Sequence, residues 1–181
     1  MDKESLSIYL LLDTSGSMHG EPILSMQNGL QIFVSALSRN IRTFGKIYLS
    51  VITFGDHAEV ALPLTPIENF SLPTLEPFGC SAMGEALMLA AHEIDANNKV
   101  DDYLNPWRPE VFIVTDGEPT DNINNGLYEL GKRSIANLVL CLAGQESRTD
   151  APWLSRITDN VVSLDTADSN ALFNYVINAD N

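Results

Sequence analysis

The sequence predicts an α/β fold of the Rossmann-like, doubly wound kind, in which helices cover both faces of a mostly parallel sheet. Apolar runs of strand length alternate along the whole chain with segments whose apolar residues recur at helical spacing. Polar turns follow two of the apolar runs directly. Because open α/β sheets bind ligands outside the carboxyl ends of their strands, these turns are also where a functional site is expected.

The first predicted elements are a strand and a long helix. Residues 8–12 form an uninterrupted apolar run and predict a buried strand. Glu21 and Pro22 then open a helix, since proline is favoured in the first helical turn. The apolar residues that follow share one helical face, which predicts core packing rather than a cofactor site. They are Ile23, Met26, Leu30, Phe33, Val34 and Leu37.

A β-hairpin and a second helix come next. Residues 46–54 predict a strand, and a turn at 55–57 leads back into a second arm over 58–62. Pro63 is expected to end this arm and to place it at an edge of the sheet, because proline has no N–H to donate. After a loop, residues 83–96 predict a helix with small and apolar residues on one face.

Strand and helix signals keep alternating in the second half of the chain. We expect strands over 111–114, 136–142 and 160–164, and helices over 123–133, 151–157 and 171–177. With right-handed crossovers, six strands take the order 3-2-1-4-5-6, with strand 3 as an antiparallel edge. No linker, repeat or low-complexity tract interrupts the pattern, so we expect one domain over residues 1–181.

Composition narrows the classes of function. The chain has 24 acidic against 10 basic residues, a formal charge of −14, which argues against nucleic acid because phosphate binding depends on Lys and Arg. No stretch approaches the roughly 18 apolar residues of a membrane span, and the N-terminus lacks the basic start of a secretory signal. Cys80 and Cys141 form no paired motif and are read as a loop thiol and a core thiol. We expect a cytoplasmic protein without a membrane partner, of undetermined oligomeric state.

Carboxylates and hydroxyls follow the first and fourth predicted strands. Asp13, Ser15 and Ser17 come after the first strand, and Asp116 comes after the fourth. Such residues also form ordinary helix-capping turns, which explain a single turn about equally well. Two strand ends that carry Asp favour a site instead. Strands 1 and 4 are neighbours where the winding reverses, so we expect Asp13 and Asp116 to face each other there.

The donors gathered at this end of the sheet are oxygen atoms. Ser81, in a glycine-bearing loop before the helix at 83–96, adds another hydroxyl at the same end. Oxygen donors of this kind suit Mg²⁺, with Mn²⁺ or Ca²⁺ as alternatives, rather than a thiol-seeking metal. The sequence therefore predicts a metal site, and we expect no organic cofactor.

The motifs resemble the metal-ion-dependent adhesion site of von Willebrand factor type A domains. Residues 13–17 match its first element, Asp-x-Ser-x-Ser. A later element commonly reads Gly-Gly-Thr-x-x-Gly-x-Ala-Leu, and alignment on Gly84 puts Ser81 in the place of the coordinating Thr and Cys80 in the place of the second Gly. Ser keeps the oxygen ligand. The residues at 115–121 complete the family's set of motifs in the family's order.

The resemblance implies a role for each site residue. Ser15 and Ser17 would bind the metal directly, Ser81 directly or through water, and Asp13 and Asp116 directly or through coordinated waters. An exchangeable position on the metal would accept an Asp or Glu of a protein partner. Within the family, three segments look most like the bacterial tellurium-resistance (TerY-type) stand-alone domains, which implies an adaptor in a chemical-stress module with an operon-encoded kinase or phosphatase as partner. These segments are residues 12–22, 107–109 and 115–121.

A metal-dependent phosphohydrolase of the haloacid-dehalogenase type is the alternative from another class. Such enzymes also place an Asp after strand 1, but they use Asp-x-Asp, and here the second position is Ser15. The chain has no glycine-rich nucleotide-binding motif and shows no nucleophile–base pair, so we expect a binding domain and not an enzyme. Glu118 and Asp121 are expected to face solvent beside the site.

Overall fold

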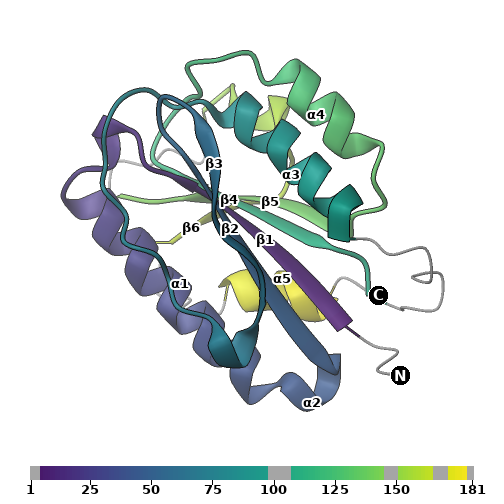
Figure 1. Ribbon diagram of the computed structural model, residues 1–181. Helices are drawn as coiled ribbons and strands as arrows, with labels where there is room; N and C mark the ends of the chain where they lie inside the picture. Colours follow the sequence, from purple (N-terminus) through teal and green to yellow (C-terminus); the bar gives the residue numbers. More distant parts are fainter. Residues whose placement is uncertain (1–4, 98–106, 145–150, 165–170, 179–181) are drawn as a thin grey trace.

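Six strands form one sheet in the order β3-β2-β1-β4-β5-β6, as the sequence predicts (Figure 1). The computed structural model describes residues 5–97, 107–144, 151–164 and 171–178. All neighbouring strands are parallel except β2 and β3, so the antiparallel edge is confirmed. The strands are β1 (Ser5–Asp13), β2 (Lys46–Phe54), β3 (Ala58–Pro66), β4 (Glu110–Thr115), β5 (Asn137–Leu142) and β6 (Val161–Ser163).

Helices cover both faces of this sheet. In Figure 1, α1, α2 and α5 lie on one face, and α3 and α4 lie on the other. The α-helices are α1 (Glu21–Arg39), α2 (Ile41–Phe44), α3 (Met83–Asn97), α4 (Asn124–Gly131) and α5 (Ala171–Asn178). Single 3₁₀ turns are η1 (Gly16–Met18), η2 (Ile67–Asn69) and η4 (Leu154–Arg156). The short helix α2 was not predicted. Among the described residues, no helix is both long and apolar enough to cross a membrane.

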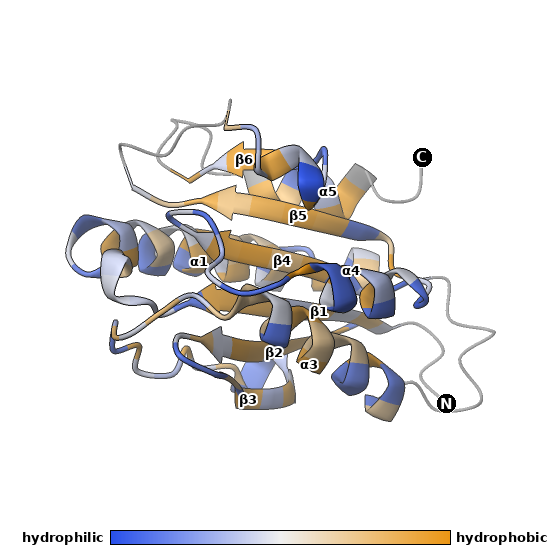
Figure 2. Ribbon diagram, turned by 90° about the horizontal axis from the view of Figure 1, so that it is seen from above, coloured by the Kyte–Doolittle hydropathy of each residue, from blue (hydrophilic) through white to orange (hydrophobic). Residues whose placement is uncertain are grey.

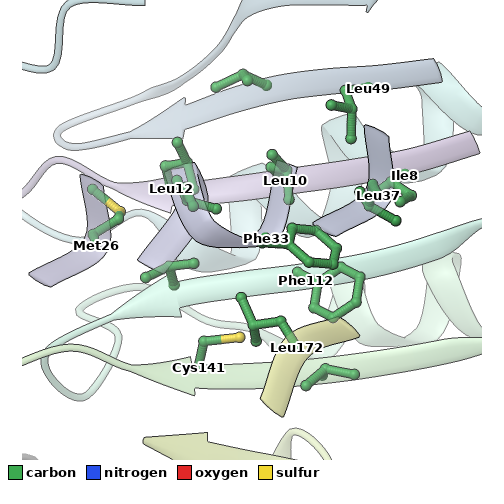
Figure 3. Close-up of a cluster of buried hydrophobic side chains, with 14 of the residues drawn as sticks. Ile8, Leu10, Leu12, Met26, Phe33, Leu37, Leu49, Phe112, Cys141 and Leu172 are labelled. Carbon is green, nitrogen blue, oxygen red and sulfur yellow. The ribbon is translucent and has the colours of Figure 1, made fainter. Parts of the chain in front are cut away.

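The central strand β1 is buried on both faces because its alternate side chains enter two separate cores. Leu10 and Leu12 pack in the core beneath α1 and α5, whereas Tyr9 and Leu11 pack in the core beneath α3 and α4. Figure 2 shows the resulting hydrophobic colouring of the strands. In the first core, Phe33 of α1 meets Phe112 of β4 with ring centroids 5.2 Å apart (Figure 3). The expected stripe on α1 is thus confirmed as core.

The predicted end of strand β3 was wrong. The strand continues past Pro63, because a bulge accommodates the proline. Leu62 pairs with Val51 and Thr65 pairs with Leu49, so two residues of β3 lie opposite one residue of β2. At a bulge on an edge strand, the N–H that proline lacks is not needed for the ladder.

The predicted helix over 151–157 was also wrong, because only η4 is helical within it. Pro152 lies in the turn that precedes η4, and Thr158 follows it. The Thr158 hydroxyl donates to the Leu138 carbonyl at 2.8 Å and accepts the N–H of Asn160 at 3.1 Å. These bonds direct the chain into β6 after a single helical turn.

Candidate metal centre

The carboxyl ends of β1 and β4 lie side by side, at the point where the winding of the sheet reverses. Leu12 pairs with Val114 in the parallel register, which brings the next residues, Asp13 and Thr115, together. The turn after β1 and the loop after β4 therefore emerge at one edge of the sheet. The predicted proximity of the two strand-end motifs is confirmed.

Asp13 is the buried centre of this group, with only 1% of its surface exposed. Its Oδ1 accepts the backbone N–H of Ser15 at 2.8 Å. Its Oδ2 accepts the Ser81 hydroxyl at 3.0 Å and the Thr115 hydroxyl at 2.6 Å. Asp13 thus connects the turn after β1, the loop before α3 and the end of β4.

Asp116 joins the same network through the two serines of the first turn. The Ser17 hydroxyl donates to Asp116 Oδ1 at 2.9 Å. Ser15 Oγ lies 3.1 Å from Ser17 Oγ, within hydrogen-bonding distance, so the two hydroxyls are linked. All five predicted site residues therefore lie in one connected set of hydrogen bonds.

The electrostatics of Asp13 favour a positive partner. Burial raises the pKa of its carboxyl group, and hydrogen bonds from Thr115, Ser15 and Ser81 oppose that rise by stabilising the charged form. A cation placed at this carboxylate would stabilise the charged form much further. Burial thus makes Asp13 costly to ionise in the absence of such a partner.

The donor set fits a hard divalent cation. It consists of two carboxylates and three hydroxyls, and the protons of Ser17 and Ser81 point to the carboxylates, which leaves the hydroxyl lone pairs for a metal. Within the described part of the chain, no three or more His, Cys, Asp or Glu side chains gather as a metal cage. Oxygen donors of this kind suit Mg²⁺ or Mn²⁺ better than they suit zinc.

The loop that carries Ser81 is irregular, yet backbone contacts fix it. The N–H of Phe78 donates to the Thr14 carbonyl at 2.7 Å, and the Gly79 carbonyl accepts the N–H of Gly16 at 3.0 Å. Cys80 donates its N–H to the Asp56 carboxylate at 2.8 Å. The backbone of Gly79 has φ +77°, and a Cβ there would lie 2.3 Å from Asp56 Oδ1, so this position requires glycine. These bonds attach the loop to the turn that follows β1.

Thr120 and Asp121 lie next to the site and make hydrogen bonds that the sequence did not predict. Asp121 is exposed, as expected, and its carboxylate also accepts the N–H groups of Gly84 at 2.9 Å and Glu85 at 3.0 Å, at the start of α3. Thr120 is hydrogen-bonded to Ser81. The partners in these pairs are 39 and 37 residues apart in the sequence, which is too far for a local sequence motif to indicate the contact. Glu118 is exposed, as expected.

Thr115 was also missed as a partner of Asp13. It is fully buried as the last residue of β4, and its hydroxyl accepts the N–H of Gly117 at 3.2 Å while donating to Asp13. A hydroxyl directly after the apolar run 111–114 was the available signal. Both cysteines lie as expected: Cys80 is exposed, and Cys141 is buried, which raises the pKa of its thiol well above the usual range.

A doubly wound sheet with acidic and hydroxyl side chains at its winding reversal defines a class of α/β binding domains. Within that class, the chain belongs to the von Willebrand factor type A domain family, whose model matches residues 8–118. The matched segment includes all five predicted site residues. Domains of this family typically serve in protein interaction and adhesion. Membership in the family gives no support to the phosphohydrolase alternative.

An uncharacterised protein of Synechocystis sp. is 28% identical over 131 residues, which cover 70% of this chain and 28% of that protein. The chain thus spans little more than a quarter of this relative's length.

Solved structures share the fold at low identity. Proximal thread matrix protein 1 from the mussel byssus gives a TM-score of 0.67 at 15% identity, over 97% of this chain and 48% of that one. The PilB minor pilin of Streptococcus sanguinis gives 0.69 at 12% identity, over 98% and 61%. An aerotolerance-related membrane protein of Bacteroides fragilis gives 0.59 at 16% identity, over 97% and 98%. These similarities concern the fold alone.

Proposed function

We propose that this chain is a protein-interaction domain that binds its partner through a divalent cation, Mg²⁺ or Mn²⁺. The ion would be held by a set of oxygen donors at the carboxyl end of the sheet. These are Asp13, Ser15, Ser17, Ser81 and Asp116. The observation that carries the proposal is the hydrogen-bonded network in which the hydroxyls of Ser17 and Ser81 donate to the two carboxylates. Their lone pairs remain for a cation.

The donor set also leaves room for a partner. Two carboxylates roughly balance the charge of a divalent ion, so the ion can still attract another anionic oxygen. Mg²⁺ usually keeps several waters, one of which a carboxylate can replace. We infer that the partner is a protein that supplies an Asp or Glu side chain. The strongly acidic chain would repel such a partner elsewhere on its surface.

Phe78 supports a protein partner rather than a small anion. Its side chain is 75% exposed, three residues before Ser81, while its backbone N–H is hydrogen-bonded to Thr14 in the turn that follows β1. Exposed aromatic side chains on a fixed backbone lose little conformational freedom on binding and are frequent interface hot spots. We assign Phe78 to the same binding face as the metal.

The finer assignment is an adaptor in a bacterial tellurium-resistance or chemical-stress module linked to protein phosphorylation, in the cytoplasm. Its support is the resemblance of residues 12–22, 107–109 and 115–121 to TerY-type domains. A kinase or phosphatase encoded beside this chain should bind it in Mg²⁺ and dissociate in excess chelator. Binding that persists in chelator would contradict a metal-bridged interface.

Calorimetric titration with Mn²⁺ tests the metal centre. We expect one ion per chain, strong loss of binding in Asp116→Asn, and unchanged binding in Glu118→Gln, which removes an exposed carboxylate from the same loop. Absence of binding to the wild type, or equal binding by both variants, would refute the assignment.

With a generic aryl phosphate in Mg²⁺ we expect no turnover. Turnover abolished by Asp13→Asn would instead favour the phosphohydrolase.

A further inference from the structure

The loop after β4 holds more of the site than Asp116 alone. Thr120 lies four residues further along. It forms hydrogen bonds with both the backbone N–H and the backbone carbonyl of Ser81. The N–H of Ser81 donates to Thr120 Oγ1 at 3.0 Å. The Ser81 carbonyl accepts the Thr120 N–H at 3.0 Å and the Thr120 hydroxyl at 3.1 Å. Ser81 is therefore fixed on both sides of its Cα by a single residue.

Asp121 fixes the chain just after Ser81. Its two carboxylate oxygens accept the N–H groups of Gly84 and Glu85, in the first turn of α3, where the helix has unpaired donors. The contact is close, because a Cβ on Gly84 would lie 2.4 Å from the Asn122 carbonyl oxygen. The beginning of α3 thus rests directly on the loop of Asp116.

These contacts determine where the Ser81 side chain can point. With the peptide groups on both sides of Ser81 fixed and the helix start fixed beyond it, the direction of its Cα–Cβ bond is set. The hydroxyl then lies 3.0 Å from Asp13 Oδ2. A metal centre needs its ligands held within a fraction of an ångström, and such precision comes from supporting contacts of this kind.

We propose that Thr120 and Asp121 are positioning residues that hold the Ser81 hydroxyl at the metal centre. This inference rests on the proposed metal function and assigns two further residues to it. They join Ser81 and Asp116, which come from separate loops, into one unit. Neither residue touches the metal in this proposal.

The first test is the affinity for Mn²⁺ by calorimetry. Thr120→Val keeps the shape of the side chain but removes its hydroxyl and both of the hydrogen bonds that the hydroxyl makes to Ser81, so we expect the dissociation constant for Mn²⁺ to rise about tenfold. Thr120→Ser should retain the wild-type affinity. Asp121→Asn should weaken binding in the same direction. Thr43→Val makes the same change at an exposed threonine just before β2, at the opposite end of the sheet, and should have no effect.

A double-mutant cycle separates positioning from general destabilisation. If Thr120 acts through Ser81, Thr120→Val should weaken Mn²⁺ binding in the wild type but add almost nothing in a Ser81→Ala background. The same fold-change in both backgrounds, or no change in either, would overturn the proposal. Wild-type protein that binds no Mn²⁺ would overturn the metal function itself, so the two failures are distinguished by the first titration.

Discussion

Cys80 and Ser81 are neighbours with different tasks. The Ser81 hydroxyl donates a hydrogen bond to the buried Asp13. Cys80 donates its backbone N–H to Asp56, and the residue is exposed to solvent. Alignment of the loop on Gly84 predicts that Ser81 belongs to the site, and in the structure its hydroxyl lies 3.0 Å from Asp13 Oδ2. Hydroxyl oxygen is also the better ligand for a hard cation, because a neutral thiol binds Mg²⁺ poorly.

This difference gives a prediction at the residue scale. Ser81→Ala should weaken Mg²⁺ binding, since it removes a hydroxyl from the donor set, and Cys80→Ser should leave binding nearly unchanged. Calorimetric titration of both folded variants measures this. The reverse pattern would mean that the loop is aligned one residue out or that the metal is a softer ion.

At the scale of elements, α3 and α4 approach each other through glycine. A Cβ on Gly126 of α4 would lie 2.5 Å from the Gly84 carbonyl oxygen and 2.7 Å from Leu87 Cβ. Backbone and a core side chain cannot yield easily at such distances. This contact holds α4 against the helix whose first turn follows Ser81.

Gly126→Ala should therefore destabilise the protein by about 1–3 kcal/mol, the usual cost of overpacking. Gly131→Ala is the matched control in the same helix, because a Cβ there meets nothing within 4 Å. That control should leave stability unchanged or raise it by up to about 1 kcal/mol, through the higher helix propensity of Ala. Urea unfolding midpoints compare the two variants, and equal midpoints would show that α4 can shift to relieve the contact.

The far ends of the same two helices are joined by ions. Arg133, just beyond α4, donates through Nε to Asp95 Oδ1 of α3 at 3.1 Å and through Nη1 to Glu129 Oε2 at 2.9 Å. The hydrogen bond from Arg133 is the main cause that lowers the pKa of Asp95. For Glu129, the bond from Lys132 lowers the pKa most, followed by that from Arg133.

These lowered pKa values predict a pH dependence. A carboxyl group with a lowered pKa in the folded state stabilises the protein above its unfolded pKa, about 3.9 for Asp and 4.3 for Glu, and this contribution is lost as the pH falls through the folded pKa. Arg133→Gln should therefore be less stable than wild type near pH 7, and the difference should shrink as the pH falls below about 4. Thermal melts from pH 7 to pH 3 measure it, with Arg42→Gln on α2 as control. A difference independent of pH would indicate lost packing instead.

The predicted elements show why some features were accessible from sequence and others were not. Strand β2 has the predicted bounds, because one glycine lies directly before it and another directly after it. The prediction ended strand β3 too early, because the bulge that tolerates Pro63 depends on pairing with the neighbouring strand β2. The hydrogen bonds of Thr120 and Asp121 were not predicted because their partners lie 39 and 37 residues away in the sequence, and only the folded sheet brings them together. The spacing of apolar residues along the sequence predicts which side chains are buried, but it does not predict which distant polar groups form hydrogen bonds.

On the scale of the whole molecule, a bound cation should raise thermal stability. At a free concentration about 100 times the dissociation constant, one site adds about 2.7 kcal/mol. For a chain of this length each kcal/mol raises the melting temperature by about 2–4 °C, so we expect a rise of about 5–11 °C in Mg²⁺ or Mn²⁺. Asp13→Asn should show no such rise. An equal rise in this variant would mean that the ions act on the acidic surface and not on the site.

The wide separation of the site residues along the chain has a consequence for folding kinetics. Thr115 and Asp13 are 102 residues apart, and Asp116 and Ser17 are 99 apart. Contacts that close such long loops form late, after β1 and β4 have paired. A cation would then meet its ligands only after the rate-limiting step. Stopped-flow measurements should show that Mn²⁺ slows unfolding and leaves the refolding rate unchanged, so the ion would lengthen the lifetime of the native state without helping the chain to reach it.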